Sequence, residues 1–180
     1  APLRRRIGPE LRMIASGGAR LDPATAALLE SLGFEVLGGY GLTETAPILA
    51  FSPRGRRWRD TAGKPIEGVE LRIAAGETPE IQARGPNVFA GYWRNPAATA
   101  AAFTDDGWFR TGDLGAIDHD GELRVTGRLK ELIVLGGGKK LDPEMIEAVY
   151  GRSELIAELA VLERGGRLFA LVVPNIPALK

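Results

Sequence analysis

The 180-residue chain is 44% hydrophobic and 26% charged, a composition typical of a folded globular protein and unlike that of a disordered one. Its 23 Lys and Arg balance 23 Asp and Glu, so a net charge of zero predicts no global attraction to nucleic acid or to an anionic membrane. The lack of cysteine excludes disulfides and thiolate chemistry, and a single histidine, His119, makes a multi-histidine metal site or a Ser-His-Asp triad hard to build.

The first elements along the chain predict a pair of parallel strands. Residues 11–15 form an expected strand. The Asp-Pro pair at 22–23 predicts the start of a helix over 24–32, and Gly33 suits the left-handed position that ends it. A second strand is expected at 34–37, ending at the two glycines that follow. The succession of strand, helix and strand is typical of a parallel sheet.

The middle of the chain predicts a small antiparallel sheet or partial barrel. Residues 69–73 and 80–84 alternate apolar and polar side chains, as half-buried strands do. An Asn-Pro pair starts a short Ala-rich helix expected over 95–103. The segments 106–107 and 119–121 have the composition of turns between strands.

The last part of the chain predicts an α+β unit. A strand at 132–135 precedes a flexible glycine loop at 136–138. An Asp-Pro pair caps a helix expected over 142–150. Two apolar runs, 160–162 and 168–173, predict a hairpin.

Three clusters carry chemistry suited to a nucleotide, although each alone leaves a structural alternative open. In 38–45, glycines allow close backbone approach, a Tyr ring suits a base, a Thr hydroxyl suits phosphate and a Glu suits Mg²⁺; an ordinary polar turn is equally consistent. Asp113 can accept both ribose hydroxyls, or it can bond its own turn. Arg128 can reach a sugar or phosphate, or it can lie solvated in a surface turn.

The order of these clusters resembles the signatures of the adenylate-forming superfamily, which includes acyl-CoA and aryl-CoA ligases, luciferases and peptide-synthetase adenylation domains. The matching signatures are Tyr40–Glu44, Thr111–Asp113 and Gly127–Lys130. Other segments similar to the family are 16–19, 63–65, 84–88, 91–96, 107–113 and 136–147, so the resemblance extends from about Leu11 to Val173. The run Gly-Arg-Leu-Lys-Glu-Leu-Ile before a glycine-lysine loop is most similar to long-chain fatty acyl-CoA synthetases.

This resemblance implies a fold of α/β plus α+β type in three parts. Residues 1–60 are expected to be the end of an α/β adenylation domain that binds the nucleotide. Residues 61–129 are expected to form a small β-barrel-like subdomain. Residues 130–180 are expected to begin an α+β C-terminal lid domain, which rotates about a hinge at Lys130 between two half-reactions.

The resemblance also implies an activity: ATP activates a carboxylate as acyl-AMP, pyrophosphate leaves, and the acyl group passes to CoA, with Mg²⁺ required. The nucleotide would be held by residues of all three clusters, namely Gly17, Gly18, Ala19, Tyr40, Gly41, Thr43, Asp113 and Arg128. Thr43 and Glu44 would be catalytic, through phosphate contact and Mg²⁺ binding respectively. Gly39 would border the acyl pocket, and Gly136, Gly137 and Gly138 would approach the pantetheine arm of CoA.

The expected substrates are small molecules: a medium- or long-chain fatty acid, ATP and CoA. One alternative is a fatty acyl-AMP ligase that loads a carrier protein; another is a non-catalytic module that binds nucleotide or a partner. We expect a cytoplasmic protein, peripheral to the membrane through its lipid substrate, with no transmembrane segment and no nucleic-acid partner. The basic stretch 54–59 is expected to be a solvated loop, and His119 a turn residue.

The resemblance further implies that this sequence is a fragment whose partner is the remainder of the parent enzyme. The family's phosphate loop belongs upstream of Leu11, and its catalytic Lys belongs beyond Lys180; neither Lys139 nor Lys140 has the context to replace it. Losing such charge stabilisation costs about 3 kcal/mol or more per donor. We therefore expect the 180-residue chain alone to show little or no ATP–pyrophosphate exchange, and a rate near that of the intact enzyme would contradict this.

Overall fold

The computed structural model describes residues 6–179, which form two compact units. Unit 1 contains the residues up to Thr111 together with Gly115–Val125. Unit 2 contains Gly112–Leu114 and the residues from Thr126 onward. The expected three-part division at residues 60 and 129 stays a prediction.

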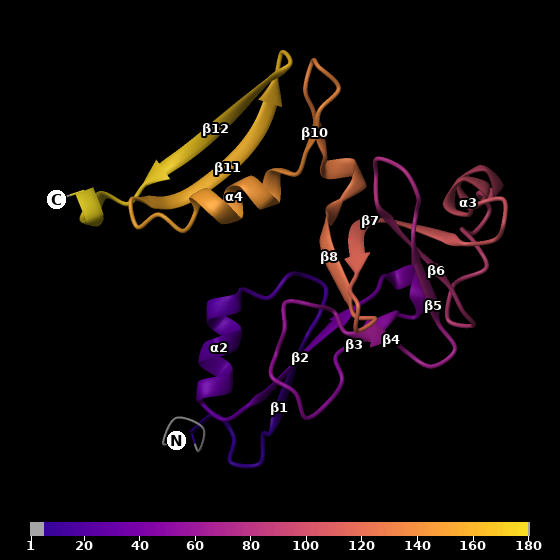
Figure 1. The fold of residues 1–180 in the computed structure, drawn as a ribbon, viewed down its shortest axis with the longest axis horizontal. Helices are drawn as coiled ribbons and strands as arrows, with labels where there is room; N and C mark the ends of the chain where they lie inside the picture. Colours follow the sequence, from indigo (N-terminus) through magenta and orange to yellow (C-terminus); the bar gives the residue numbers. More distant parts are fainter. Residues whose placement is uncertain (1–5, 180) are drawn as a thin grey trace. The chain divides into compact units, whose positions relative to one another are not determined.

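Unit 1 begins with a mixed sheet. Its strands in spatial order are β1 (Met13–Ser16), β2 (Glu35–Tyr40), β3 (Ala50–Phe51) and β4 (Lys64–Pro65). The strands β1 and β2 pair in parallel, with Met13 opposite Glu35, whereas β3 pairs antiparallel with both of its neighbours. The helix α2 (Pro23–Ser31) connects the parallel strands and lies beside β2 (Figure 1). The predicted parallel pair is therefore confirmed.

The helix α2 begins where its capping residues predict. The Asp22 carboxylate accepts hydrogen bonds from the backbone N–H of Thr25 at 2.8 Å and from its hydroxyl at 2.9 Å. These bonds lower the pKa of Asp22. Gly33 follows the helix in the left-handed conformation, with φ of 87°.

The strand β2 differs from its prediction, because it continues through Gly38 and Gly39 to Tyr40 instead of ending at the glycines. The added residues pair with β3, where Gly39 lies opposite Phe51. A Cβ atom at Gly39 would lie only 2.9 Å from the Phe51 ring, so the absent side chain is what allows the ring to cover the strand. The end of β2 therefore depends on pairing with the short strand β3, which local sequence does not reveal.

The second sheet contains β5 (Glu70–Ile73), β6 (Glu80–Arg84), β7 (Phe109–Ile117) and β8 (Leu123–Arg128), in that spatial order. The helix α3 (Pro96–Ala102) precedes β7, and the Asn95 side chain caps it by accepting from the N–H of Ala98 at 3.0 Å. This confirms the predicted β-rich region. The core of unit 1 includes two buried clusters: Leu49, Val69, Ala83 and Phe109, and Ala50, Ile81 and Leu123.

Unit 2 contains two hairpins and a helix. The elements after β8 are η2 (Leu129–Glu131), β9 (Ile133–Val134), β10 (Lys140–Leu141), α4 (Pro143–Tyr150), β11 (Ile156–Arg164), β12 (Arg167–Pro174) and η3 (Ile176–Leu179). The helix α4 packs on β11, where the Glu147 carboxylate accepts from the N–H of Val161 at 2.6 Å. The predicted hairpin is confirmed with longer strands, and the strand predicted at 132–135 is shorter.

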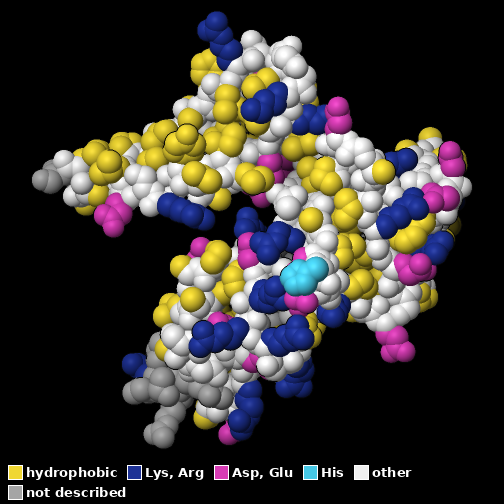
Figure 2. Space-filling view, viewed as in Figure 1, with side chains coloured by type: hydrophobic (Ala, Val, Ile, Leu, Met, Phe, Trp, Pro, Cys, Tyr) yellow, Lys and Arg dark blue, Asp and Glu magenta, His cyan; other side chains and the backbone are white. Residues whose placement is uncertain are grey.

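Hydrophobic side chains remain exposed along the hairpin of β11 and β12 (Figure 2). Leu171 is 66% exposed, and Val172 and Val173 are each 50% exposed. None of the helices between residues 6 and 179 is long and apolar enough to cross a bilayer. Taken together, the two units confirm the predicted combination of α/β and α+β architecture.

The close backbone contact at Gly63 generates a stability prediction. Gly63 has φ of 84°, its carbonyl accepts from the N–H of Leu123 at 2.7 Å, and an added Cβ would overlap the Phe51 backbone. Left-handed strain and overpacking together predict that Gly63→Ala lowers the free energy of unfolding by about 2–5 kcal/mol, measured by urea denaturation.

Gly55→Ala is the matched control, because Gly55 has φ of 77° but open space around its Cβ position. We expect a loss of only about 1–2 kcal/mol from strain there. Equal losses in the two variants would show that the close contact at Gly63 contributes nothing.

Candidate functional site

Two glycine segments far apart in the sequence meet where β1 and β2 end. Ser16, the last residue of β1, pairs with Gly38. A Cβ atom on Gly17 would lie 3.2 Å from the carbonyl oxygen of Gly39, so the backbones approach closely. Parallel strands present their carboxyl ends at one edge of a sheet, where such folds bind ligands. The structure thus brings the exposed Gly17 beside Gly39, the residue before Tyr40.

The turn after β2 folds back tightly on itself. A Cβ atom at Gly41 would overlap the Pro47 carbonyl, so a glycine is required there. The fully buried Thr45 hydroxyl accepts from the N–H of Leu42 at 2.9 Å and lies 3.1 Å from the Pro47 carbonyl oxygen. These contacts fix the short 3₁₀ helix η1 (Thr43–Thr45). Thr45 holds the turn from inside, whereas Thr43 is exposed.

Glu44 is half-buried on this turn and is held at two points. Its carboxylate Oε1 accepts from the Tyr92 hydroxyl at 3.1 Å, and its carbonyl accepts from the N–H of Phe89 at 2.8 Å. Within residues 6–179, no Lys, Arg or His lies at salt-bridge distance from this carboxylate. An anionic oxygen that no protein cation neutralises fits the ligand preference of Mg²⁺.

Sequence reasoning missed two residues of this site, Asn87 and Tyr92. The Asn87 amide donates to the carbonyls of Thr45 and Ile48, each at 2.7 Å, and so pins the outside of the turn. Partial burial, and then the hydrogen bond to Glu44, raises the pKa of Tyr92. Both residues lie in segments similar to the family, which was the only signal available for them.

In unit 2, Asp113 and Arg128 lie together. Asp113 is buried within β7, and Arg128 ends β8; the Arg128 Nε lies 3.4 Å from the Asp113 carboxylate. Asp113 therefore lies in the middle of a strand and not in the turn that the alternative interpretation placed it in. A buried carboxylate beside a guanidinium offers acceptors and donors of the kind that sugar hydroxyls need.

The remaining predicted positions of unit 2 lie in exposed connections. Lys130 is exposed in η2, and 136–138 form the turn between β9 and β10. A Cβ atom at Gly127 would overlap the carboxylate of Asp142, which caps α4 by accepting from the N–H of Glu144 at 2.9 Å. The roles of Lys130 and of the glycine loop stay predictions.

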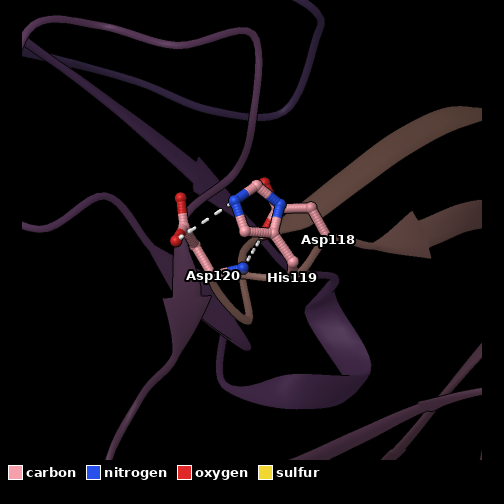
Figure 3. A group of neighbouring side chains, drawn as sticks. All are labelled: Asp118, His119 and Asp120. Atoms are coloured by element: carbon pink, nitrogen blue, oxygen red, sulfur yellow. Dashed lines mark hydrogen bonds and ion pairs between the residues drawn. The ribbon is translucent and has the colours of Figure 1, made fainter.

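The basic stretch 54–59 is exposed and ion-paired. Arg59 lies 2.7 Å from the Asp120 carboxylate, and Arg56 lies 3.5 Å from that of Glu122. His119 lies in the turn, as predicted, with its ring beside Asp120 (Figure 3). These ion pairs connect the basic stretch 54–59 to the turn that contains His119, so the basic stretch has a structural role.

The Asp118, His119 and Asp120 side chains bring their possible metal-ligand atoms within 4.8 Å of one another. The Asp118 carboxylate, however, accepts from the N–H groups of Asp120 at 2.9 Å and Glu122 at 3.0 Å. Those hydrogen bonds also lower the pKa of Asp118.

Two curated ligases and one solved structure illustrate what this chain is similar to. A long-chain-fatty-acid–CoA ligase, FadD15, of Mycobacterium bovis is 44% identical over 160 residues, which cover 89% of this chain and 26% of that protein. A chloroplastic long-chain-fatty-acid–acyl-carrier-protein ligase, AEE15, of Arabidopsis thaliana is 34% identical over 180 residues, covering 89% of this chain and 25% of that protein.

Among solved structures, the O-succinylbenzoate coenzyme A synthetase of Bacillus subtilis in complex with ATP and magnesium ion is 31% identical, with a TM-score of 0.76. The match covers 91% of this chain and 37% of that one. The chain thus spans about a quarter of the length of these curated relatives. The family described as AMP-binding enzyme matches residues 3–93, about half of the chain. The chain therefore belongs to the family of AMP-binding, adenylate-forming enzymes.

Proposed function

We propose that the full-length gene product containing this chain is an ATP-dependent acid–thiol ligase. It activates a medium- or long-chain fatty acid as acyl-AMP, releases pyrophosphate and then forms the CoA thioester. One observation carries this proposal: Gly17 meets Gly39 at one sheet edge, next to Tyr40 and just before the turn that contains Glu44. The 44% identity to a long-chain-fatty-acid–CoA ligase supports the substrate class.

In the proposed first half-reaction, a carboxylate oxygen attacks the α-phosphorus of ATP and the bond to pyrophosphate breaks. Segment 17–19 borders the adenine and Tyr40 lies against it, with the backbone of Gly41 beside the nucleotide. The exposed Thr43 hydroxyl donates to phosphate, and Glu44 would hold Mg²⁺, which would neutralise phosphate charge. Gly39 lies beside the acyl chain.

We propose that unit 2 contributes to both half-reactions. Asp113 accepts hydrogen bonds from the ribose hydroxyls, and Arg128, at 3.4 Å from it, orients that carboxylate. Lys130 is the hinge of a lid that spans 130–180, because a few backbone angles in a short exposed segment can absorb a large rotation. The glycine loop 136–138 then approaches the pantetheine arm of CoA.

The proposed substrate also bears on location. A fatty acyl chain partitions into lipid at about 0.8 kcal/mol per buried CH₂ group. We therefore propose a cytoplasmic enzyme that meets its substrate at the membrane surface.

Glu44→Gln in the full-length product tests the first half-reaction. Removing the anionic ligand should lower fatty-acid-dependent ATP–pyrophosphate exchange by about 100- to 1,000-fold, because transition-state charge loses its stabilisation. The matched control is Glu77→Gln, since Glu77 is exposed and has no hydrogen bond or ion pair with any described residue. Unchanged exchange in Glu44→Gln would sink the proposed role of Glu44.

The thiol acceptor separates the proposed function from a second candidate, a ligase that loads a carrier protein. The similarity to the Arabidopsis acyl-carrier-protein ligase favours testing it. Supplying dodecanoate and ATP with either CoA or a phosphopantetheinylated carrier protein, and detecting thioesters by mass spectrometry, should give acyl-CoA. A thioester on the carrier protein alone would favour the second candidate, and nucleotide binding without exchange would favour a non-catalytic module.

A further inference from the structure

The contact between Tyr92 and Glu44 joins two segments that are 48 residues apart in the sequence. The Tyr92 hydroxyl donates to the Oε1 atom of Glu44 at 3.1 Å. The carboxylate has a second oxygen, Oε2, and an ionised carboxylate can accept at both. A bond to one oxygen therefore orients the carboxylate while leaving the other for a cation.

The position of Tyr92 is itself fixed from two sides. Its backbone N–H donates to the hydroxyl of Thr99 at 2.9 Å, and that hydroxyl donates to the Asn95 carbonyl at the start of α3, also at 2.9 Å. Its ring packs edge-on against Phe89, with centroids 4.8 Å apart at 74°. Contacts of both the backbone and the ring therefore hold the residue that carries this hydroxyl.

The same support holds the main chain of Glu44. Phe89 packs against Phe103 and Phe109, with ring centroids 5.9 and 5.4 Å away, and its N–H donates to the Glu44 carbonyl at 2.8 Å. One short segment, 89–92, thus grips Glu44 at both its carbonyl and its carboxylate.

We propose that Tyr92 is a positioning residue for the magnesium site: its hydroxyl holds one oxygen of the Glu44 carboxylate and directs the other toward the cation. This inference rests on the proposed function, in which Glu44 is the magnesium ligand. Partners that orient a metal ligand typically change metal affinity by about 10- to 100-fold when they are removed.

Tyr92→Phe is the test, because it removes the hydroxyl and keeps the ring that packs on Phe89. In the full-length product with α,β-methylene-ATP, Mn²⁺ binding followed by electron paramagnetic resonance should weaken about tenfold or more. Saturating Mg²⁺ should restore the rate of ATP–pyrophosphate exchange in Tyr92→Phe. A general packing defect would not respond to the metal in this way.

The matched control is Tyr150→Phe, which also removes a tyrosine hydroxyl, but from a side chain on α4 that is 62% exposed. Its Mn²⁺ affinity should equal that of the wild type. Wild-type Mn²⁺ affinity in Tyr92→Phe would overturn the inference, as would a loss of exchange that saturating Mg²⁺ does not restore.

Mn²⁺ binding by Glu44→Gln separates the proposed magnesium role of Glu44 from the proposed positioning role of Tyr92. If it weakens Mn²⁺ binding while Tyr92→Phe does not, the positioning role of Tyr92 fails and the magnesium role of Glu44 stands. If Mn²⁺ binding is unchanged in Glu44→Gln, the proposed magnesium site itself fails, and the inference fails with it.

Discussion

The buried hydroxyl of Thr45 closes the turn after β2, and the candidate site depends on that closure. It accepts from the N–H of Leu42 and lies within hydrogen-bond distance of two carbonyls, so a side chain replaces the backbone partners that a longer helix would supply. Because the Thr45 side chain is buried, Thr43 and Glu44 are the residues of this turn that remain accessible to a ligand. Asn87 secures the same turn from outside, at the carbonyls of Thr45 and Ile48. The candidate site is thus part of a turn that Thr45 stabilises from inside and Asn87 from outside.

The helices were predictable because their start signals are local. Asp22, Asn95 and Asp142 each precede a proline, and each side chain accepts a backbone N–H of the helix it starts. Such a bond depends on two or three neighbouring residues and needs no tertiary partner. The residue types of Tyr40–Glu44 suit a phosphate and cation site but are equally consistent with an ordinary polar turn, so there the family resemblance, and not local chemistry, favoured a nucleotide site.

What the sequence concealed depends on distant pairing. The extension of β2 through its glycines requires Phe51 opposite Gly39, and a glycine pair by itself favours a strand end. Likewise Gly112-Asp113 has the local pattern of a turn, but β7 incorporates it as a strand. The hydrogen bond from Tyr92 to Glu44 has no local sequence signal, because the two residues are 48 positions apart. The family resemblance identified the segments that contain Asn87 and Tyr92, but it did not indicate which residues they contact.

The exposed hairpin of β11 and β12 has a consequence for how the protein behaves in solution. Leu171 and its neighbours form an apolar surface on a two-stranded sheet, with β12 as an outer edge. Exposed apolar edges favour association between copies, and net charge normally opposes it. With a formal charge of zero at pH 7, this chain has no such long-range repulsion. Its solubility should therefore be lowest near neutral pH and limited by the hairpin, so concentrated samples are best held well away from neutrality.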